Sequence, residues 1–245
     1  FIQNVAKIIF FVYFCKVLNL SNFYTVLSLF SRTQLLIGKD SLIRLQDLKI
    51  VIFGIGGVGG WTAEALIRSG VKNLTLVDPD NVCQSNINRQ LVATQKTIGR
   101  PKVDVMKERL LDINPEAEIV ALNQKYSKET ATDFDLNEYD YVVDAIDSVD
   151  DKVLLILNAT QSSAQFVSSM GAARKMDPLK VSVAEFWKVK GCPLAATLRR
   201  KIKKGGIFPQ KKFKCVYSEE LLENKDVLES EERVNGSMIH ITGVF

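Results

Sequence analysis

The segment KIVIFGIGGVGG, residues 49–60, is the clearest indication of the fold of this chain. Residues 49–53 form a short continuous apolar run, which is typical of a buried parallel strand. Residues 54–60 form a tight glycine turn, and residues 61–69 have the pattern of a helix that ends at Gly70. A strand, a glycine turn and a helix in this order predict the first unit of a nucleotide-binding sheet.

Strand and helix patterns alternate on both sides of this unit. Residues 31–48 have the pattern of a helical lead-in, and helical patterns return at residues 101–113 and 153–164. Further strand patterns lie at residues 74–77, 118–122, 139–143 and 166–169. This alternation predicts an α/β protein with a Rossmann-like, doubly wound, mostly parallel sheet and helices on both faces.

Length and composition are those of an ordinary globular protein. The chain has 245 residues, 47% of them hydrophobic and 24% charged, and a formal net charge of +4. This mild basic excess gives only weak support for an anionic partner. The cysteines, at positions 15, 83, 192 and 215, form no CxxC pair, so we expect no structural zinc and a reducing compartment such as the cytoplasm.

The first thirty residues differ in composition from the rest of the chain. Residues 1–30 contain no Asp, Glu, Gly or Pro, and polar residues interrupt their apolar run before it is long enough to span a bilayer. No cleavage site of small residues marks a signal peptide. Three interpretations stay open: upstream sequence read as protein or a disordered extension, a membrane-associating segment, and a helix of the domain.

The glycine turn has the spacing of a phosphate-binding loop. Gly54, Gly56 and Gly59 match GxGxxG, with Gly57 between them. Glycines let the backbone approach a phosphate closely, and the N-terminus of the following helix favours its negative charge. Asp78 lies about twenty residues further on, where an acid can accept hydrogen bonds from a ribose. A dinucleotide dehydrogenase fits these features equally well.

Two cations after Asp78 favour a triphosphate over a dinucleotide. Arg89 can clamp phosphate oxygens in a bidentate manner. Lys102, near the start of a helix, can neutralise charge that builds on a leaving pyrophosphate. Asp147 follows the strand at residues 139–143, where open α/β sheets bind ligands, and can hold magnesium. The sequence therefore predicts an ATP site with these three residues in catalytic roles.

Five segments in this region carry a family resemblance. FGIGGVGG, LVDPDNV, SNINRQ, GRPKVDVM and DAIDS resemble the ubiquitin-activating-type adenylyltransferases, over residues 31–169. The resemblance implies a homodimer in which an arginine of the lead-in, here Arg32, reaches the ATP of the partner subunit. It also implies that ATP is served by the glycine loop, Asp78, Asn86, Arg89, Gln90, Lys102 and Asp147.

The second half of the chain resembles one branch of that superfamily. SSMGAARKMDP, CPLAATLRRKIKKGGI and KCVYSEE are similar to the tRNA threonylcarbamoyladenosine dehydratases. The resemblance implies that ATP activates a carboxylate on the adenosine beside the anticodon of tRNA, as an adenylate that then cyclises. The branch that activates sulfur-carrier proteins usually has two CxxC pairs, which are absent here. The resemblance weakens after Glu219, so we expect the C-terminal part to be truncated.

Basic residues accumulate between positions 174 and 214, where only Asp177 and Glu185 oppose them. Such a local excess suits a phosphate backbone. We therefore expect residues 31–170 to be the ATP-binding domain and residues 171–245 to be a basic C-terminal extension that binds tRNA. The candidate contacts to nucleic acid are Arg199, Arg200, Lys201, Lys203 and Lys204.

Other functions stay open at this point. The same ATP site would serve an adenylyltransferase that activates the C-terminal glycine of a small ubiquitin-like sulfur carrier. A non-catalytic nucleotide-binding or tRNA-binding module would bind without exchanging pyrophosphate. Cys192 or Cys215 could accept sulfur from a transfer partner, although neither has an activating neighbour in the sequence. A dehydrogenase is the weakest alternative, because nothing resembles a hydride-transfer site.

Overall fold

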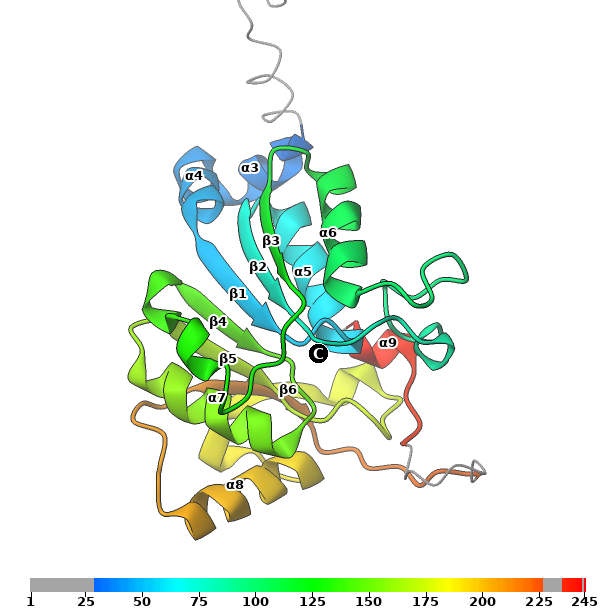
Figure 1. The fold of residues 1–245 in the computed structure, drawn as a ribbon, viewed down its shortest axis with the longest axis vertical. Helices are drawn as coiled ribbons and strands as arrows, with labels where there is room; N and C mark the ends of the chain where they lie inside the picture. Colours follow the sequence, from blue (N-terminus) through cyan, green and yellow to red (C-terminus); the bar gives the residue numbers. More distant parts are fainter. Residues whose placement is uncertain (1–28, 227–234, 244) are drawn as a thin grey trace, which may run out of the picture. The chain divides into compact units, whose positions relative to one another are not determined.

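The computed structural model describes residues 29–226, 235–243 and 245, and it divides the chain into two units, Phe1–Gln46 and Asp47–Phe245 (Figure 1). The predictions for residues 1–28 lie outside the described residues. Within the described residues, no helix has the length and apolar character needed to cross a membrane.

The helical lead-in is two helices rather than one. Helix α3 spans Ser31–Ile37 and helix α4 spans Lys39–Asp47. Gly38 separates them with a φ of +84°. A residue with positive φ cannot continue a right-handed helix, so the helical lead-in predicted over residues 31–48 is divided at this position.

The second unit is built on one seven-stranded sheet with the order β3-β2-β1-β4-β5-β7-β6 (Figure 1). Every neighbouring pair is parallel except β6 with β7, which is antiparallel. The strand order reverses between β1 and β4, which is the switch point of a doubly wound sheet. The predicted fold class is confirmed. The strands are β1 (Lys49–Phe53), β2 (Asn73–Val77), β3 (Glu118–Leu122), β4 (Tyr141–Asp144), β5 (Gln165–Ser169), β6 (Val181–Glu185) and β7 (Lys214–Ser218).

Helices cover the two faces of this sheet. Helices α5 and α6 contact each other, and helices α7 and α8 contact each other. Figure 1 shows the two pairs on opposite sides of the strands. Alternate residues of β1 explain this: Val51 and Phe53 join the core shared with α7 and α8, while Ile50 and Ile52 are buried on the other face. The bounds are α5 (Gly57–Ser69), α6 (Lys102–Ile113), α7 (Val149–Gln161), α8 (Pro193–Gly205) and α9 (Ile239–Thr242).

Two helices begin earlier than their sequence patterns predict. Helix α5 begins at Gly57, four residues before the predicted start, so the glycines of the motif form its first turn. Helix α7 begins at Val149 rather than at residue 153. Glycine has a low helix propensity, but packing against the sheet overrides that preference here.

The basic segment after residue 171 completes the sheet. Strand β7 pairs with β5, β6 pairs with β7, and α8 packs on α7. Cys215 and Tyr217 of β7, with Leu198 and Ile202 of α8, belong to the same core as β1 and β4. The segment is therefore not an extension set apart from the sheet, because apolar positions between its lysines bury against that core. Its assignment to tRNA binding stays a prediction.

Candidate active site

The glycine loop packs so tightly that two of its glycines are sterically required. Gly54 has a φ of +92°, and a Cβ atom there would lie 2.6 Å from the carbonyl oxygen of Ala145. A Cβ atom on Gly59 would lie 1.8 Å from the carbonyl oxygen of Gly54. Gly59 was predicted to bind the cofactor, but it does not line the cavity described below; it lets α5 approach the loop after β1.

The N-terminus of α5 is open to a ligand. Its N-cap is Gly56, no side chain caps the helix, and its first turn contains no acid. The first N–H groups of a helix have no partner within the helix, and its dipole favours an anion there. A Cβ atom on Gly56 would meet only Nε2 of Gln90, at 3.7 Å. The start of α5, from Gly56 to Val58, lines the cavity described below, where an anion would meet these N–H groups.

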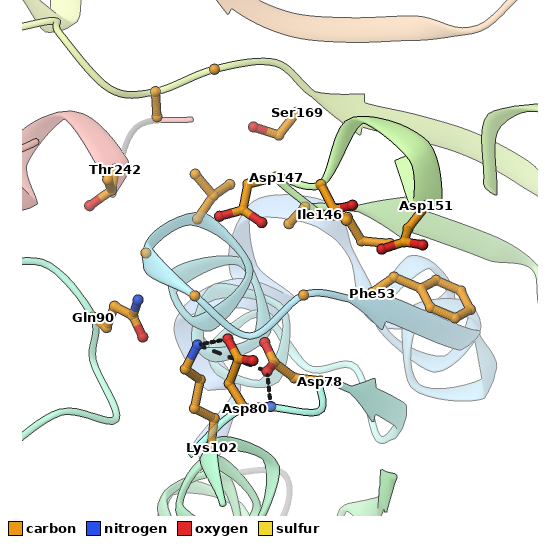
Figure 2. Close-up of a pocket in the computed structure, with 18 of the residues that line it drawn as sticks. Phe53, Asp78, Asp80, Gln90, Lys102, Ile146, Asp147, Asp151, Ser169 and Thr242 are labelled. Carbon is orange, nitrogen blue, oxygen red and sulfur yellow. Dashed lines mark hydrogen bonds and ion pairs between the residues drawn. The ribbon is translucent and has the colours of Figure 1, made fainter. Parts of the chain in front are cut away.

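A cavity of about 540 Å³ lies at the carboxyl ends of β1, β2, β4 and β5 (Figure 2). Doubly wound sheets bind their ligands at this edge, beside the switch point. Most of the residues predicted to serve ATP line this cavity. They are Gly54, Gly56, Gly57, Asp78, Arg89, Gln90, Lys102 and Asp147.

Asp78 is buried and braces the glycine loop. Its Oδ2 atom accepts a hydrogen bond from the Ile55 amide at 2.6 Å, and its Oδ1 atom accepts one from the Asp80 amide at 2.9 Å. Burial raises the pKa of Asp78, and the positive charge of Lys102 opposes that rise. Asp78 thus fixes the loop against β2, and its contact with a ribose stays a prediction.

Lys102 reaches the cavity from the first turn of α6. Its side chain is only 7% exposed, and its Nζ atom lies 2.7 Å from Oδ2 of Asp80 and 3.9 Å from Oδ1 of Asp78. Figure 2 shows these three residues together on one side of the glycine loop. Asp80 was not among the predicted site residues, although its position shortly after β2 is a signal that could have identified it.

Arg89 lines the same cavity from the loop between β2 and α6. Its Nη1 atom donates to the Ser85 carbonyl at 3.0 Å and to Oδ1 of Asn88 at 2.9 Å. These acceptors hold the guanidinium beside its own loop, and a phosphate clamp would have to compete with them. Arg89 and Lys102 nevertheless line the same cavity, as the prediction requires.

The two amides predicted to serve ATP differ in their surroundings. Gln90 is buried, and its Oε1 atom has no hydrogen-bond partner among the described residues. Such an atom beside a cavity is a place for a donor on a ligand. Asn86 does not line the cavity; its Oδ1 atom accepts from the Cys83 amide at 3.1 Å and shapes the short helix η1 (Gln84–Asn86). Its predicted contact with ATP has no support here.

Asp147 is exposed at the rim of the cavity, across the glycine loop from Lys102 (Figure 2). Asp151 lines the same rim and forms an ion pair with Lys125 at 3.0 Å. No group of three metal-ligating side chains occurs in the described part of the chain. Mg²⁺ commonly uses one or two carboxylates together with substrate phosphates, so an exposed Asp147 fits that donor set.

A fully buried ion pair holds the loop that carries Asp147. Nζ of Lys152 lies 2.9 Å from Oδ2 of Asp144, and both side chains are 0% exposed. Lys152 also donates to the Ile146 carbonyl at 2.9 Å, and the Ile146 amide donates to Asp144 at 3.1 Å. In the sequence, Lys152 lies just before the predicted helix at residues 153–164 and no local pattern marks it as buried, so its role was missed.

Comparisons with known proteins agree with this geometry. The model of the ThiF family matches residues 30–242. This chain belongs to the ThiF family. The tRNA threonylcarbamoyladenosine dehydratase of Bacillus subtilis is 44% identical over 191 residues, which cover 78% of this chain and 74% of that protein.

Solved structures extend this ThiF-family likeness to the whole fold. The crystal structure of the Escherichia coli tRNA N6-threonylcarbamoyladenosine dehydratase in complex with ATP has a TM-score of 0.81 and 34% identity, and covers 89% of this chain and 88% of that one.

The molybdopterin-synthase adenylyltransferase of Escherichia coli is 35% identical over 138 residues, which cover 56% of this chain and 54% of that protein.

Two of the described cysteines of this ThiF-family protein lie in its core. Cys192 and Cys215 are both buried. Burial raises the pKa of the Cys215 thiol far above its usual range, which keeps it protonated. Because the thiolate is the reactive form, the structure gives no support to sulfur transfer through Cys215.

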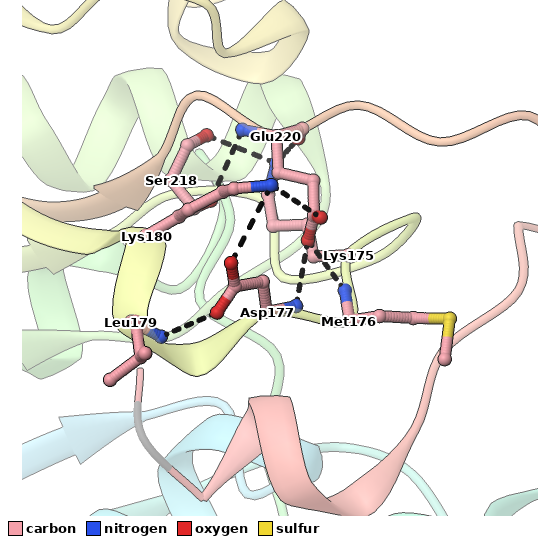
Figure 3. A network of polar contacts seen from close by, with 7 residues as sticks. All are labelled: Lys175, Met176, Asp177, Leu179, Lys180, Ser218 and Glu220. Atoms are coloured by element: carbon pink, nitrogen blue, oxygen red, sulfur yellow. Dashed lines mark hydrogen bonds and ion pairs between the residues drawn. The ribbon is translucent and has the colours of Figure 1, made fainter.

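A network of polar contacts joins the chain around Lys175 to Ser218 and Glu220 (Figure 3). Gly171, Ala172 and Ala173 line the cavity, and Lys175, just beyond them, donates to the Ser218 carbonyl at 3.0 Å and to the Glu220 carbonyl. The Glu220 carboxylate accepts from the amides of residues 176 and 177 at 2.6 Å and 2.9 Å. These hydrogen bonds, with Lys180, hold the pKa of Glu220 down to about 2.

Helix α8 divides the five cations predicted to bind nucleic acid. Arg199 is committed within the fold, because its Nη1 atom donates to the carbonyls of Phe186 at 2.9 Å and Val189 at 2.8 Å. Lys201 pairs with Asp150. Arg200, Lys203 and Lys204 are exposed, and no described carboxylate pairs with them. These three are the members of the predicted set that remain available to a phosphate backbone.

Proposed function

We propose that this ThiF-family protein is an ATP-dependent tRNA threonylcarbamoyladenosine dehydratase. One observation carries the proposal: Lys102, Arg89 and the uncapped N-terminus of α5 line a single cavity. Two cations and a helix N-terminus suit a triphosphate better than a dinucleotide. The likeness to dehydratases covers 78% of the chain, against 56% for the molybdopterin-synthase adenylyltransferase, and so supports this branch over carrier-protein activation.

In the first step, a carboxylate oxygen of the threonylcarbamoyl group attacks the α-phosphorus of ATP. A new bond forms between that oxygen and phosphorus, and the bond to the leaving pyrophosphate breaks. The N–H groups at the start of α5 hold phosphate oxygens, and Lys102 and Arg89 neutralise charge that grows on the leaving group. Lys102 exchanges its contact with Asp80 for one with phosphate.

In the second step, a neighbouring group of the same side chain attacks the activated carbonyl carbon. The bond between that carbon and the AMP oxygen breaks, the attacking group releases its proton to solvent, and the ring closes. The oxygen leaves with AMP, so the nucleoside has lost the elements of one water. The protein contributes mainly position, because both reacting groups already belong to one substrate. The strip from Gly171 to Ala173, fixed by Lys175 and Glu220, forms the wall against which this side chain lies.

Asp147 would hold the magnesium that accompanies ATP. Its carboxylate is exposed at the cavity, and no described residue pairs with it. Bound magnesium would neutralise phosphate charge. Lys152 and Asp144 fix the backbone before Asp147, so the carboxylate starts from a defined position.

The proposal includes a homodimer in the cytoplasm. Arg32 would complete the ATP site of the partner subunit, as the family resemblance implies. A reducing compartment agrees with the three described cysteines, which are all free. A sulfur-transfer partner is not part of the proposal, because Cys192 and Cys215 are buried.

The test is conversion of the nucleoside itself. The protein is incubated with ATP and tRNA that carries threonylcarbamoyladenosine, and the digested nucleosides are analysed by mass spectrometry. We expect a product lighter by one water, with AMP and pyrophosphate formed in equal amounts. Unchanged nucleoside, together with ATP–pyrophosphate exchange that depends on a small carrier protein ending in Gly-Gly, would replace the proposal with the carrier-protein alternative.

A further inference from the structure

Two large aromatic side chains lie on the surface beside the basic end of α8. Trp187, in the short helix η5 (Phe186–Lys188), is 39% exposed, and Phe208, just beyond α8, is 52% exposed. Their ring centroids are 6.2 Å apart. Nζ of Lys203 lies 5.9 Å from the centroid of the Trp187 ring. An aromatic pair, with a cation over one face of the Trp187 ring, is thus presented to solvent.

Contacts within the fold hold the aromatic platform, which consists of Trp187 and Phe208, in place. Arg199 ties α8 to the backbone on both sides of Trp187 through the carbonyls of Phe186 and Val189. The Trp187 amide donates to Oε2 of Glu185 at 3.1 Å, and the Trp187 ring packs edge-on against Phe186 at 5.2 Å. Because these contacts fix Trp187 before a ligand arrives, a flat group that stacks on it costs little conformational entropy.

Unpaired cations continue from the platform along α8. Lys203 is four residues after Arg199 and so shares its side of the helix, while Arg200 and Lys204 form the next row. Lys203, Arg200 and Lys204 are exposed and have no described carboxylate partner. Aromatic faces interleaved with free cations are the combination that binds single-stranded nucleic acid.

Helix α8 also connects the platform to the cavity. Leu194, in its first turn, lines the cavity, and Lys203 lies nine residues further along. At the rise of an α-helix this separation is about 14 Å. A few unpaired nucleotides span this distance. A strand with its modified nucleotide in the cavity would therefore place a nearby base at Trp187.

We propose that Trp187 and Phe208 stack an unpaired base of the tRNA anticodon loop, close to the nucleotide that enters the cavity. Lys203, Arg200 and Lys204 hold the phosphates on either side of that base. This inference rests on the proposed function, because it takes the substrate to be tRNA. It adds a base-stacking site to a surface for which charge alone predicted only phosphate contacts.

The test is binding of an anticodon stem-loop RNA to the full chain, by fluorescence anisotropy of a labelled RNA. Trp187→Leu removes the aromatic face and keeps an apolar side chain, so Kd should rise at least about fivefold. Trp187→Phe should recover most of the affinity. Tyr141→Leu is the matched control, because Tyr141 is 38% exposed at the opposite end of the strands and should leave Kd unchanged.

Catalysis separates this inference from the proposed function. If Trp187→Leu raises KM for the RNA and leaves kcat at saturating RNA within about twofold of wild type, the stacking site is supported. If wild-type protein binds the RNA through Trp187 but does not dehydrate it, the proposed function fails and the stacking site stands. Equal RNA affinity for wild type and Trp187→Leu overturns the stacking site, as does a Trp187-dependent affinity for acidic phospholipid vesicles without affinity for RNA.

Discussion

Lys102, which lines the cavity, and Lys152, which holds the loop that carries Asp147, make similar ion pairs in different surroundings. Nζ of Lys102 lies 2.7 Å from an Asp80 carboxylate that is 63% exposed, whereas Lys152 lies 2.9 Å from an Asp144 carboxylate that is 0% exposed. A ligand from solvent can displace the first carboxylate but cannot reach the second. The comparison teaches that nearly equal distances can serve ligand binding in one pair and loop positioning in the other.

Removing Lys152 should have the largest effect on stability. Lys152→Met leaves Asp144 buried and unpaired, which should lower the free energy of unfolding by about 3–5 kcal/mol. Urea denaturation measures this loss. Adding Asp144→Asn to Lys152→Met should recover much of the stability, because no uncompensated charge then remains in the core.

The matched control for Lys152 is Lys72→Met. Lys72 pairs with Glu116 at 3.4 Å, and both side chains are partly exposed. An exposed pair contributes about 0–1 kcal/mol, so Lys72→Met should change stability little. If Lys152→Met were as stable as this control, the buried pair would not hold the loop as described.

Removing Lys102 should have the largest effect on catalysis. Lys102→Met should lower kcat for AMP formation about 10²- to 10³-fold, because one preorganised cation at the leaving group is lost. Its loss of stability should be smaller than that of Lys152→Met, because Asp80 is hydrated and the buried Asp78, 3.9 Å from Lys102, keeps its two backbone hydrogen bonds. Single-turnover AMP formation and urea denaturation are measured on the same protein, with Lys72→Met expected to keep wild-type kcat. A wild-type kcat in Lys102→Met would contradict the proposed role of Lys102 at the leaving pyrophosphate.

Changing Asp80 tests whether the exposed partner of Lys102, unlike the buried Asp144, can be displaced by a ligand. Asp80→Asn should change the free energy of unfolding by only about 0–1 kcal/mol. It should also tighten ATP binding by less than tenfold, because a carboxylate that competes with phosphate for Lys102 is removed. Isothermal titration calorimetry with ATP checks this. Weaker binding in Asp80→Asn would show instead that Asp80 contributes to holding the nucleotide.

A pH titration tests Glu220, which together with Lys175 holds the chain just beyond the cavity-lining residues 171–173. Backbone hydrogen bonds hold the pKa of Glu220 at about 2, below its ordinary value of 4.5. A depressed pKa stabilises the folded state above pH 4.5, and that stabilisation is lost as the pH falls towards 2. Glu220→Gln should therefore reduce the dependence of the melting temperature on pH between about 2 and 4.5. An unchanged pH profile in Glu220→Gln would contradict the network.

Local sequence patterns predicted much of the fold and of the phosphate-binding part of the site. The strand before Gly54, the glycine spacing and the position of Lys102 depend on neighbours in the chain, and the structure brings them together. The partners of Lys102 and Lys152 depend on tertiary contacts over many residues. The same limit explains why Arg199 was predicted to bind nucleic acid, although the backbone of residues 186–189 occupies it.

Attack of the threonylcarbamoyl carboxylate on the α-phosphorus of ATP can be tested by following one oxygen atom. The carboxylate of the threonylcarbamoyl group is labelled with a heavy oxygen isotope, and AMP from the ATP-dependent reaction is analysed by mass spectrometry. Attack of that carboxylate on the α-phosphorus predicts that one labelled oxygen leaves with AMP. Dehydration that yields only unlabelled AMP would contradict an adenylate formed at this cavity.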